Sequence, residues 1–153
     1  MEAKQNIQDI STIENLIKKE YISLWTKTKE DPFRIELSEN LYLTTNELII
    51  IDPDLHVVDT SIPTRVAKYD TILPLWAAPW ENVLEGGIKE VYDLKVAYNN
   101  DWALVTFDAT GKMLFTNNEH MSIFRNVTQL WVKTLEGWRI KHEHVSDGQQ
   151  AKN

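Results

Sequence analysis

The start of the chain has apolar residues at the spacing of a helix. Five of them follow one another at steps of three or four, which places them on one face: Ile10, Ile13, Ile17, Tyr21 and Leu24. The pattern predicts an amphipathic helix over residues 9–29, with Asp9 or Ser11 at its start. We expect it to end near Asp31-Pro32, because proline disfavours helical geometry in the residue before it.

Two more helices and one or two short strands are predicted before the middle of the chain. The helices span about 34–43 and 69–84, and Gly86-Gly87 would close the later one. Between them, the apolar run at 48–51 and the run HVVD at 56–59 are typical of short strands, with a turn at Pro53-Asp54.

From residue 88 onward the apolar positions alternate with a period of two, which is typical of β-strands. Residues 88–98 and 102–110 are predicted to form a hairpin across Asn99-Asn100-Asp101, and Thr110-Gly111-Lys112 is predicted to turn again. The segments that follow should therefore add further antiparallel strands.

Two of these strands are expected at 122–133 and 138–146, with a turn at 135–137 between them. Strict alternation along the last strand puts two sets of side chains on opposite faces of the sheet. One face would carry Trp138, Ile140, His142, His144 and Ser146, and the other Arg139, Lys141, Glu143 and Val145.

Helices that come first and antiparallel strands that come last indicate an α+β protein. We predict a cone-shaped, strongly bent antiparallel sheet with the N-terminal helices packed on its concave face. Such a cone has a pocket at its wide end, and concave, apolar space is where small ligands usually bind. A single domain is expected over residues 1–147, followed by a loose tail at 148–153.

Composition narrows the classes of function. The chain has 153 residues, no cysteine and a formal net charge of −7. It therefore has no disulfide, thiolate nucleophile or cysteine-ligated zinc, and its charge disfavours nucleic acid as a partner. The longest apolar stretch, 72–80, is about half a membrane span, and the N-terminus lacks a secretory pattern. We expect a cytoplasmic protein with neither nucleic-acid nor membrane partners.

The sequence GWRIKHEHVS at 137–146 resembles the terminal strand of the nuclear transport factor 2-like superfamily, in its SnoaL-like and ketosteroid isomerase-like branch. Pro53-Asp54, the run ending at Asp59 and then Pro63 are similar to the first strand of that branch, and IKEVYDLKVAYNNDWALVTF is similar to its central hairpin. The resemblance covers most of the chain and implies a cystatin-like fold. This fold serves isomerases, cyclases, hydrolases, binders and oligomerisation modules, so it assigns no activity by itself.

Two positions depart from the pattern of that branch. Lys68 stands where the family often has a glycine, and Asn126 stands where it often has an arginine. Arg125 lies one position away and so on the opposite face of a regular strand. The resemblance therefore does not carry an anion-binding arginine over to this chain.

The resemblance implies that Asp59 is a catalytic base that moves a proton next to a carbonyl group. Our hypothesis for an enzyme adds His144, His142 or a tyrosine as the group that polarises the substrate. In an apolar cavity, the loss of hydration would raise the pKa of Asp59 and make it a better base near neutral pH. The alternative is that Asp59 caps the turn before Thr60-Ser61 and needs no cavity.

His142 and His144 share a face in the predicted alternation, about 7 Å apart, and could reach one ligand. They could hydrogen-bond inward as ordinary strand residues, line the pocket, or hold a metal with a third ligand from His120, His56 or Asp59. We expect pocket lining before metal binding, and predict neither a metal nor a cofactor.

The six tryptophans exceed what an ordinary core needs. Core packing explains most of them, but a cavity walled by several aromatic rings would suit a flat, apolar ligand with a few polar groups. The predicted ligand pocket comprises Tyr21, Trp25, Tyr42, Trp76, Trp80, His120, Thr128 and His142.

Three functions remain open at this point. The protein could be an isomerase- or cyclase-type enzyme that transfers a proton, a non-catalytic binder of a small apolar or aromatic molecule, or an interaction module that forms oligomers. We expect a homodimer through the exposed face of the sheet.

Overall fold

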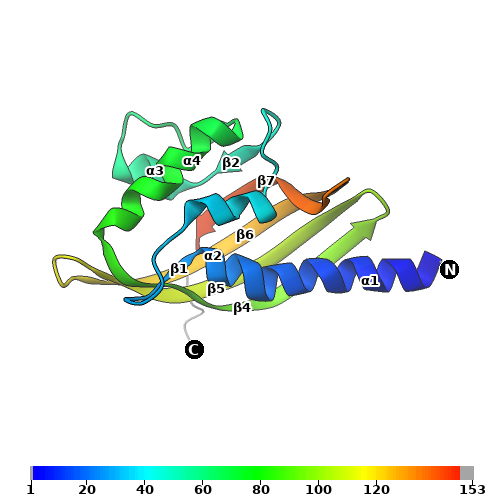
Figure 1. The fold of residues 1–153 in the computed structure, drawn as a ribbon, viewed down its shortest axis with the longest axis horizontal. Helices are drawn as coiled ribbons and strands as arrows, with labels where there is room; N and C mark the ends of the chain where they lie inside the picture. Colours follow the sequence, from blue (N-terminus) through cyan, green and yellow to red (C-terminus); the bar gives the residue numbers. More distant parts are fainter. Residues whose placement is uncertain (1, 149–153) are drawn as a thin grey trace.

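The computed structural model describes residues 2–148, without the side chains of residues 2 and 56–58. A strongly curved sheet forms one layer, and the helical segments lie over its concave face (Figure 1). The predicted α+β class and the bent sheet with N-terminal helices on its concave face are thus confirmed. The predicted tail, apart from Gly148, lies outside the described residues.

The helical segments within residues 2–148 all come before the long strands. They are α1 (Glu2–Asn15), the π-helical η1 (Leu16–Tyr21), α2 (Ile22–Leu24), the 3-10 helix η2 (Ile35–Asn40), α3 (Pro53–Val58), α4 (Tyr69–Ala77) and the 3-10 helix η3 (Ala78–Asn82). The strands are β1 (Thr26–Lys27), β2 (Ile49–Ile51), β3 (Arg65–Ala67), β4 (Val83–Asn99), β5 (Trp102–Phe115), β6 (His120–Thr134) and β7 (Gly137–Asp147).

The seven strands form one sheet in the order β1-β4-β5-β6-β7-β2-β3. Neighbouring strands are antiparallel except β2 and β7, which are parallel. The core lies between the concave face of this sheet and the helices, and no helix within residues 2–148 is long and apolar enough to cross a membrane.

The first helical segment begins earlier than predicted. α1, η1 and α2 run without a break from Glu2 to Leu24, whereas the pattern predicted residues 9–29. The expected start relied on a polar cap at Asp9 or Ser11. The Asp9 side chain instead accepts hydrogen bonds from Tyr98 and Trp138 of the sheet, and the helix continues through both residues. The predicted apolar stripe is confirmed, because four of its members are buried: Ile13, Ile17, Tyr21 and Leu24.

Residues 56–59, predicted as a strand, instead complete the helix α3, with Asp59 as its C-cap. The Asp52 side chain accepts a hydrogen bond from the N–H of Asp54 at 2.9 Å, and Pro53 follows the cap at the first helical position. Both features are typical of a helix start. The prediction of a turn at Pro53-Asp54 is therefore wrong.

Gly86 and Gly87 lie inside β4 rather than at the end of a helix. Gly87 has a φ of +135°, and a Cβ on it would lie 2.0 Å from the carbonyl oxygen of Trp25. The predicted turn at 110–112 is likewise wrong, because Gly111 continues β5 and a Cβ there would lie 1.8 Å from the Gly87 oxygen. These glycines permit a close approach of β1, β4 and β5 rather than ending an element.

The alternation along β7 is interrupted by a β-bulge. The pairing of β7 with β6 shifts between Ile140 and His142, which leaves Lys141 as an extra residue. Ile140 and Glu143 are therefore both buried on the concave side, although they are three positions apart. The prediction that Ile140, His142 and His144 share one face is wrong beyond this bulge.

Candidate functional site

A cavity of about 330 Å³ lies between the helical segments and the concave face of the sheet. Its wall is mostly apolar and includes side chains from η1, α3, α4, η3, β4, β5, β6 and β7. Among the described lining residues, the carboxyl and guanidinium groups belong to Asp52, Asp54, Arg125 and Glu143. A few polar groups in an apolar cavity of this size are typical of a small-molecule site.

Aromatic rings form one wall of the cavity. The ring centroid of Trp25 lies 5.3 Å from that of Trp76, in an edge-to-face contact, and 6.4 Å from that of Trp80, in a stacked contact. Tyr21 lines the same space. The structure thus brings together four of the residues predicted for the pocket. Tyr42 packs behind them, 4.7 Å from Trp76, and is fully buried.

Glu143 enters the cavity from β7 and is 2% exposed. The Tyr42 hydroxyl donates to its two carboxyl oxygens at 2.9 and 3.0 Å, and Gln129 Nε2 donates to Oε2 at 2.6 Å. Trp131 Nε1 in turn donates to Gln129 Oε1 at 2.8 Å, which fixes the amide orientation. The donors to Glu143 within the described residues are thus uncharged groups.

Burial, together with the nearby negative charge of Asp52, raises the pKa of Glu143 to about 7, although the hydrogen bonds from Gln129 and Tyr42 oppose the rise. Burial and the charge of Glu143 also raise the pKa of Tyr21 and of Tyr42 well above the ordinary value. The two tyrosines therefore remain protonated donors, while Glu143 can gain or lose a proton near neutral pH.

Asp52 is the second carboxylate of the cavity. It caps α3 at the end of β2, and burial followed by the charge of Asp54 raises its pKa to about 6. The hydrogen bond from the Asp54 backbone and the positive charge of Arg125 act in the opposite direction. Asp52 therefore loses its proton at a lower pH than Glu143.

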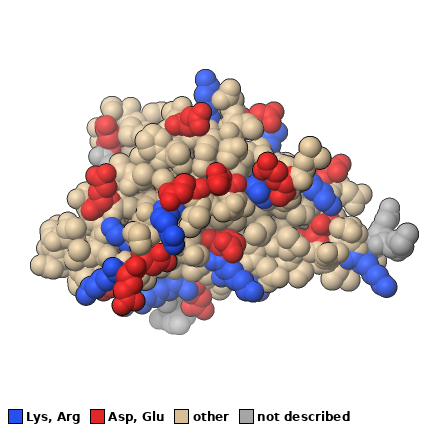
Figure 2. Space-filling model, in the orientation of Figure 1, with Lys and Arg blue, Asp and Glu red and all other residues tan. Residues whose placement is uncertain are grey.

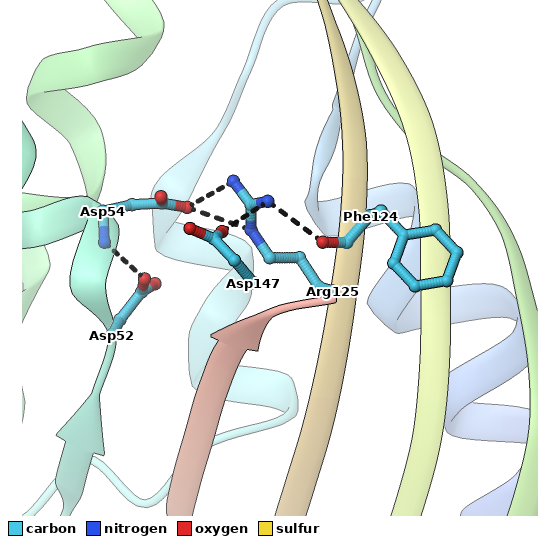
Figure 3. Close-up of polar contacts among 5 residues, drawn as sticks. All are labelled: Asp52, Asp54, Phe124, Arg125 and Asp147. Carbon is cyan, nitrogen blue, oxygen red and sulfur yellow. Dashed lines mark hydrogen bonds and ion pairs between the residues drawn. The ribbon is translucent and has the colours of Figure 1, made fainter. Parts of the chain in front are cut away.

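Arg125 on β6 lies between two further carboxylates (Figure 3). Its Nη2 is 2.9 Å from Asp54 Oδ2, and its Nη1 is 2.8 Å from Asp147 Oδ1. The Arg125 side chain is 15% exposed, whereas the two aspartates are more open to solvent. The positive charge of Arg125 is thus matched within the protein.

The structure places Asp59 outside this cavity. It is exposed at the C-cap of α3, and its Oδ1 accepts hydrogen bonds from the N–H of Ser61 at 2.9 Å and from the Ser61 hydroxyl at 2.7 Å. These contacts are those expected for a residue that caps a turn.

His120, His142, His144 and Thr128 are not among the residues that line the cavity. His144 and Thr128 are exposed and pair with each other across β7 and β6, and His142 is partly buried. The bulge at Lys141 explains why the predicted inward face of β7 turns outward here. His120 begins β6 and is exposed. No group of three or more His, Cys, Asp or Glu suited to a metal occurs in the described part of the chain.

Sequence reasoning missed Asp52, Glu143 and Arg125. An Asp-Pro pair is a helix-start signal and could have identified Asp52 as a fixed carboxylate. Alternation along β6 could have placed Arg125 with the buried Ile123 and Val127 on the inner face. Glu143 had no such signal, because regular alternation assigned it to the opposite face from Ile140.

Comparison with known proteins agrees with this architecture. A family model described as the SnoaL-like domain matches residues 44–149, and the chain therefore belongs to the SnoaL-like family. A search of curated proteins found no match.

Solved structures similar to this one include a nuclear transport factor 2-like superfamily protein from Salmonella enterica serovar Typhimurium, with a TM-score of 0.64, 17% identity, and 77% of this chain and 80% of that chain covered. A protein with a cystatin-like fold from Caulobacter vibrioides has a TM-score of 0.66 and 15% identity, and the match covers 93% of this chain and 91% of that chain. A type 2 hexachlorocyclohexane dehydrochlorinase has a TM-score of 0.59 and 11% identity, and the match covers 96% of this chain and 86% of that chain. At these identities the likeness establishes the superfamily fold.

Proposed function

We propose that the protein binds a small, mostly apolar carbonyl compound in this cavity and transfers a proton on it, in isomerase- or cyclase-type chemistry. Asp52 would be the base and Glu143 the acid that donates a hydrogen bond to the carbonyl oxygen. The observation that carries the proposal is the presence in one apolar cavity of two carboxylates with raised pKa, the buried Glu143 and the partly buried Asp52.

The two pKa values suggest the roles. Asp52, with a pKa of about 6, is the more readily ionised of the two, and Glu143, with a pKa of about 7, is the more readily protonated. A carboxylate can then accept a proton from carbon while a neutral carboxylic acid stabilises the developing negative charge on oxygen. Asp52 thus takes the role that the family resemblance suggested for Asp59, and Glu143 takes that suggested for His144.

The charges in the wall also favour a neutral substrate. Arg125 is already paired with Asp54 and Asp147, so a ligand carboxylate would have to compete with both. The ionised carboxylate of Asp52 would in addition repel an anion. A ketone or similar neutral compound can instead place its apolar body against the tryptophans and its oxygen near the acids.

The test is deuterium incorporation next to the carbonyl group of a flat bicyclic ketone, 2-tetralone, incubated with the protein in D₂O and followed by NMR. Asp52→Asn should reduce the catalysed exchange by at least about 100-fold, since a positioned base contributes this much or more. Asp59→Asn is the matched control, and it should exchange at the wild-type rate. Loss of exchange in Asp59→Asn but not in Asp52→Asn would overturn the assignment.

Binding without turnover is the second candidate, and the aromatic wall favours it. Native mass spectrometry of the protein as purified would detect a retained ligand as an adduct that denaturation removes. Tight binding of 2-tetralone, detected by quenching of tryptophan fluorescence, without any deuterium exchange in the wild type would favour the binder over the enzyme.

We also propose that the protein is a homodimer through the convex face of the sheet. Trp102 and Leu104 of β5 are each 43% exposed there, while Ala103 and Val105 between and beside them are fully buried in the core. Acidic and basic side chains are interspersed on the face visible in Figure 2, without a continuous basic patch there. Trp102→Lys should convert a dimer to a monomer in native mass spectrometry.

A cytoplasmic location stays a prediction.

A further inference from the structure

Arg125 holds Asp54 in a defined position. Its Nε and Nη2 both donate to Asp54 Oδ2, at 3.3 and 2.9 Å, while Nη1 contacts Asp147 Oδ1 at 2.8 Å and the Phe124 carbonyl oxygen at 3.2 Å. A guanidinium that is 15% exposed and engaged by all three of its nitrogens has little freedom to rotate. The ion pair therefore ties the first turn of α3 to β6.

Asp54 transmits this constraint to Asp52. The backbone N–H of Asp54 donates to Asp52 Oδ1 at 2.9 Å, as the dashed lines in Figure 3 show. Asp54 is thus held by Arg125 through its side chain, and it holds Asp52 through its backbone N–H. The path from β6 to the carboxylate in the cavity comprises two hydrogen-bonded steps.

We propose that Arg125 is a positioning residue for Asp52: by anchoring Asp54 it fixes the direction of the Asp52 carboxylate in the cavity, and its positive charge opposes the negative charges around that carboxylate. The inference rests on the proposed role of Asp52 as base. It adds a second requirement to that role, namely a cation that never touches the base directly.

The charges around Asp52 explain why such a cation is needed. Asp54 on α3 and Asp147 on β7 both raise the pKa of Asp52, and Asp52 in turn affects Glu143 on β7 and Tyr21 on η1. Arg125 supplies the opposing positive charge from β6. Without it, the charges around Asp52 would all be negative, and Asp52 would lose its proton at a higher pH.

The outward neighbour of Arg125 shows why this position suits the role. Asn126 is exposed and donates to Asp108 Oδ1 at 2.6 Å on the convex side, whereas Arg125 lies between the inward-facing Ile123 and Val127. An arginine at 126 would point away from the cavity. The one-place difference from the family pattern therefore puts the guanidinium on the cavity side.

Two variants separate the charge of Arg125 from its geometry. Arg125→Met removes both, whereas Arg125→Lys keeps the charge but cannot make the paired contacts with Asp54 while also reaching Asp147. The Asp52 pKa is measured by carboxyl ¹³C NMR titration, and the hydrogen exchange of the Asp54 backbone amide reports on the anchor. Neither measurement needs a substrate, so a failure of this inference is distinguishable from a failure of the proposed function.

Arg125→Met should raise the Asp52 pKa by up to about one pH unit, less than for a directly paired charge. It should also speed exchange of the Asp54 amide. Arg125→Lys should speed that exchange while changing the pKa much less. If the protein catalyses deuterium incorporation next to the carbonyl of 2-tetralone, the pH profile of kcat/KM for that reaction gives a further test. Its acidic limb should move to higher pH in Arg125→Met and stay in place in Arg125→Lys.

Asp147→Asn is the matched control, because it removes a partner of Arg125 without touching Asp54. It should lower the Asp52 pKa, since Asp147 raises it, and leave exchange of the Asp54 amide near the wild-type rate. The inference is overturned if Arg125→Met leaves the Asp52 pKa unchanged or lowers it. It is also overturned if both Arg125 variants retain wild-type protection of the Asp54 amide.

Discussion

Asp9 on α1 and Glu143 on β7 are two nearly fully buried carboxylates, 5% and 2% exposed, with opposite pKa shifts. Asp9 accepts hydrogen bonds from Tyr98 at 2.6 Å, from Trp138 at 3.2 Å and from the Lys133 ammonium at 3.3 Å. Burial raises the pKa of Asp9, but these donors together with Gln5 lower it further than burial raises it. The pKa of Glu143 is raised.

The difference lies in what each carboxylate contacts. Asp9 has a cation among its partners and connects α1 to β4, β6 and β7, so its charge stabilises the fold. Glu143 has neutral donors and faces a cavity, so its charge is costly in the folded protein. A buried carboxylate whose ionisation opposes folding is the better candidate for chemistry than one whose ionisation stabilises the fold.

The largest expected effect is on the pH dependence of stability in Glu143→Gln. The folded pKa of Glu143, about 7, lies above the value of roughly 4.3 expected for an unfolded chain, so its contribution to stability is full at low pH and is lost as the pH rises through 7. Glutamine cannot ionise and avoids this loss. In urea denaturation, the free energy of unfolding of Glu143→Gln relative to that of the wild type should rise by roughly 3 kcal/mol between pH 4 and pH 8.

The amide can fit the same contacts. Its oxygen can accept from Gln129, and its NH₂ group can donate to the Tyr42 hydroxyl oxygen, which also has acceptor capacity. If the wild type and Glu143→Gln lost stability in parallel between the two pH values, the folded pKa of Glu143 would not lie above its unfolded value, and the contrast with Asp9 would fail.

Asp9→Asn should have the opposite sign. It removes the charge that Lys133, Tyr98 and Trp138 all contact. Because hydrogen bonds to a charged group are stronger than those between neutral groups, the substitution should lower the free energy of unfolding by about 2 kcal/mol in total. Because the folded pKa of Asp9 is lowered, this stability is present above roughly pH 4, the unfolded pKa, and is lost as the pH falls through the folded pKa.

Urea denaturation at pH 7 and pH 3 measures the effect of Asp9→Asn, which should be larger at pH 7 than at pH 3. Lys133→Met is the companion variant, and it should cost less than Asp9→Asn because the Lys133 side chain is 42% exposed and its charge is partly screened by water. An Asp9→Asn protein as stable as the wild type at pH 7 would show that the cluster around Asp9 does not anchor α1.

The sequence was sufficient to predict the fold but only one wall of the candidate site. Helical spacing and strand alternation identified Ile13, Ile17, Tyr21 and the last four strands, because both periods follow directly from backbone geometry. The aromatic wall followed from the same periods, since Trp76 and Trp80 are four residues apart on successive helical turns.

The polar half of the site could not be predicted in the same way. Asp52 becomes a cavity residue because it caps α3, which the pattern had assigned to a strand and a turn. Glu143 reaches the cavity through the single extra residue at Lys141, and a bulge depends on the pairing with β6 rather than on the sequence of β7 alone. One inserted residue in a strand reverses every side chain beyond it, so His144 and Glu143 exchanged their expected places.

His144→Gln should have the smallest effect and tests this reversal directly. His144 is exposed on the convex side and pairs with Thr128 and Ile51 through the backbone, which the substitution leaves in place. The free energy of unfolding should change by less than about 0.5 kcal/mol. Fluorescence quenching by 2-tetralone should give a wild-type dissociation constant for His144→Gln and a changed one for Glu143→Gln, one position away. A weaker ligand affinity in His144→Gln alone would mean that His144, not Glu143, faces the bound molecule.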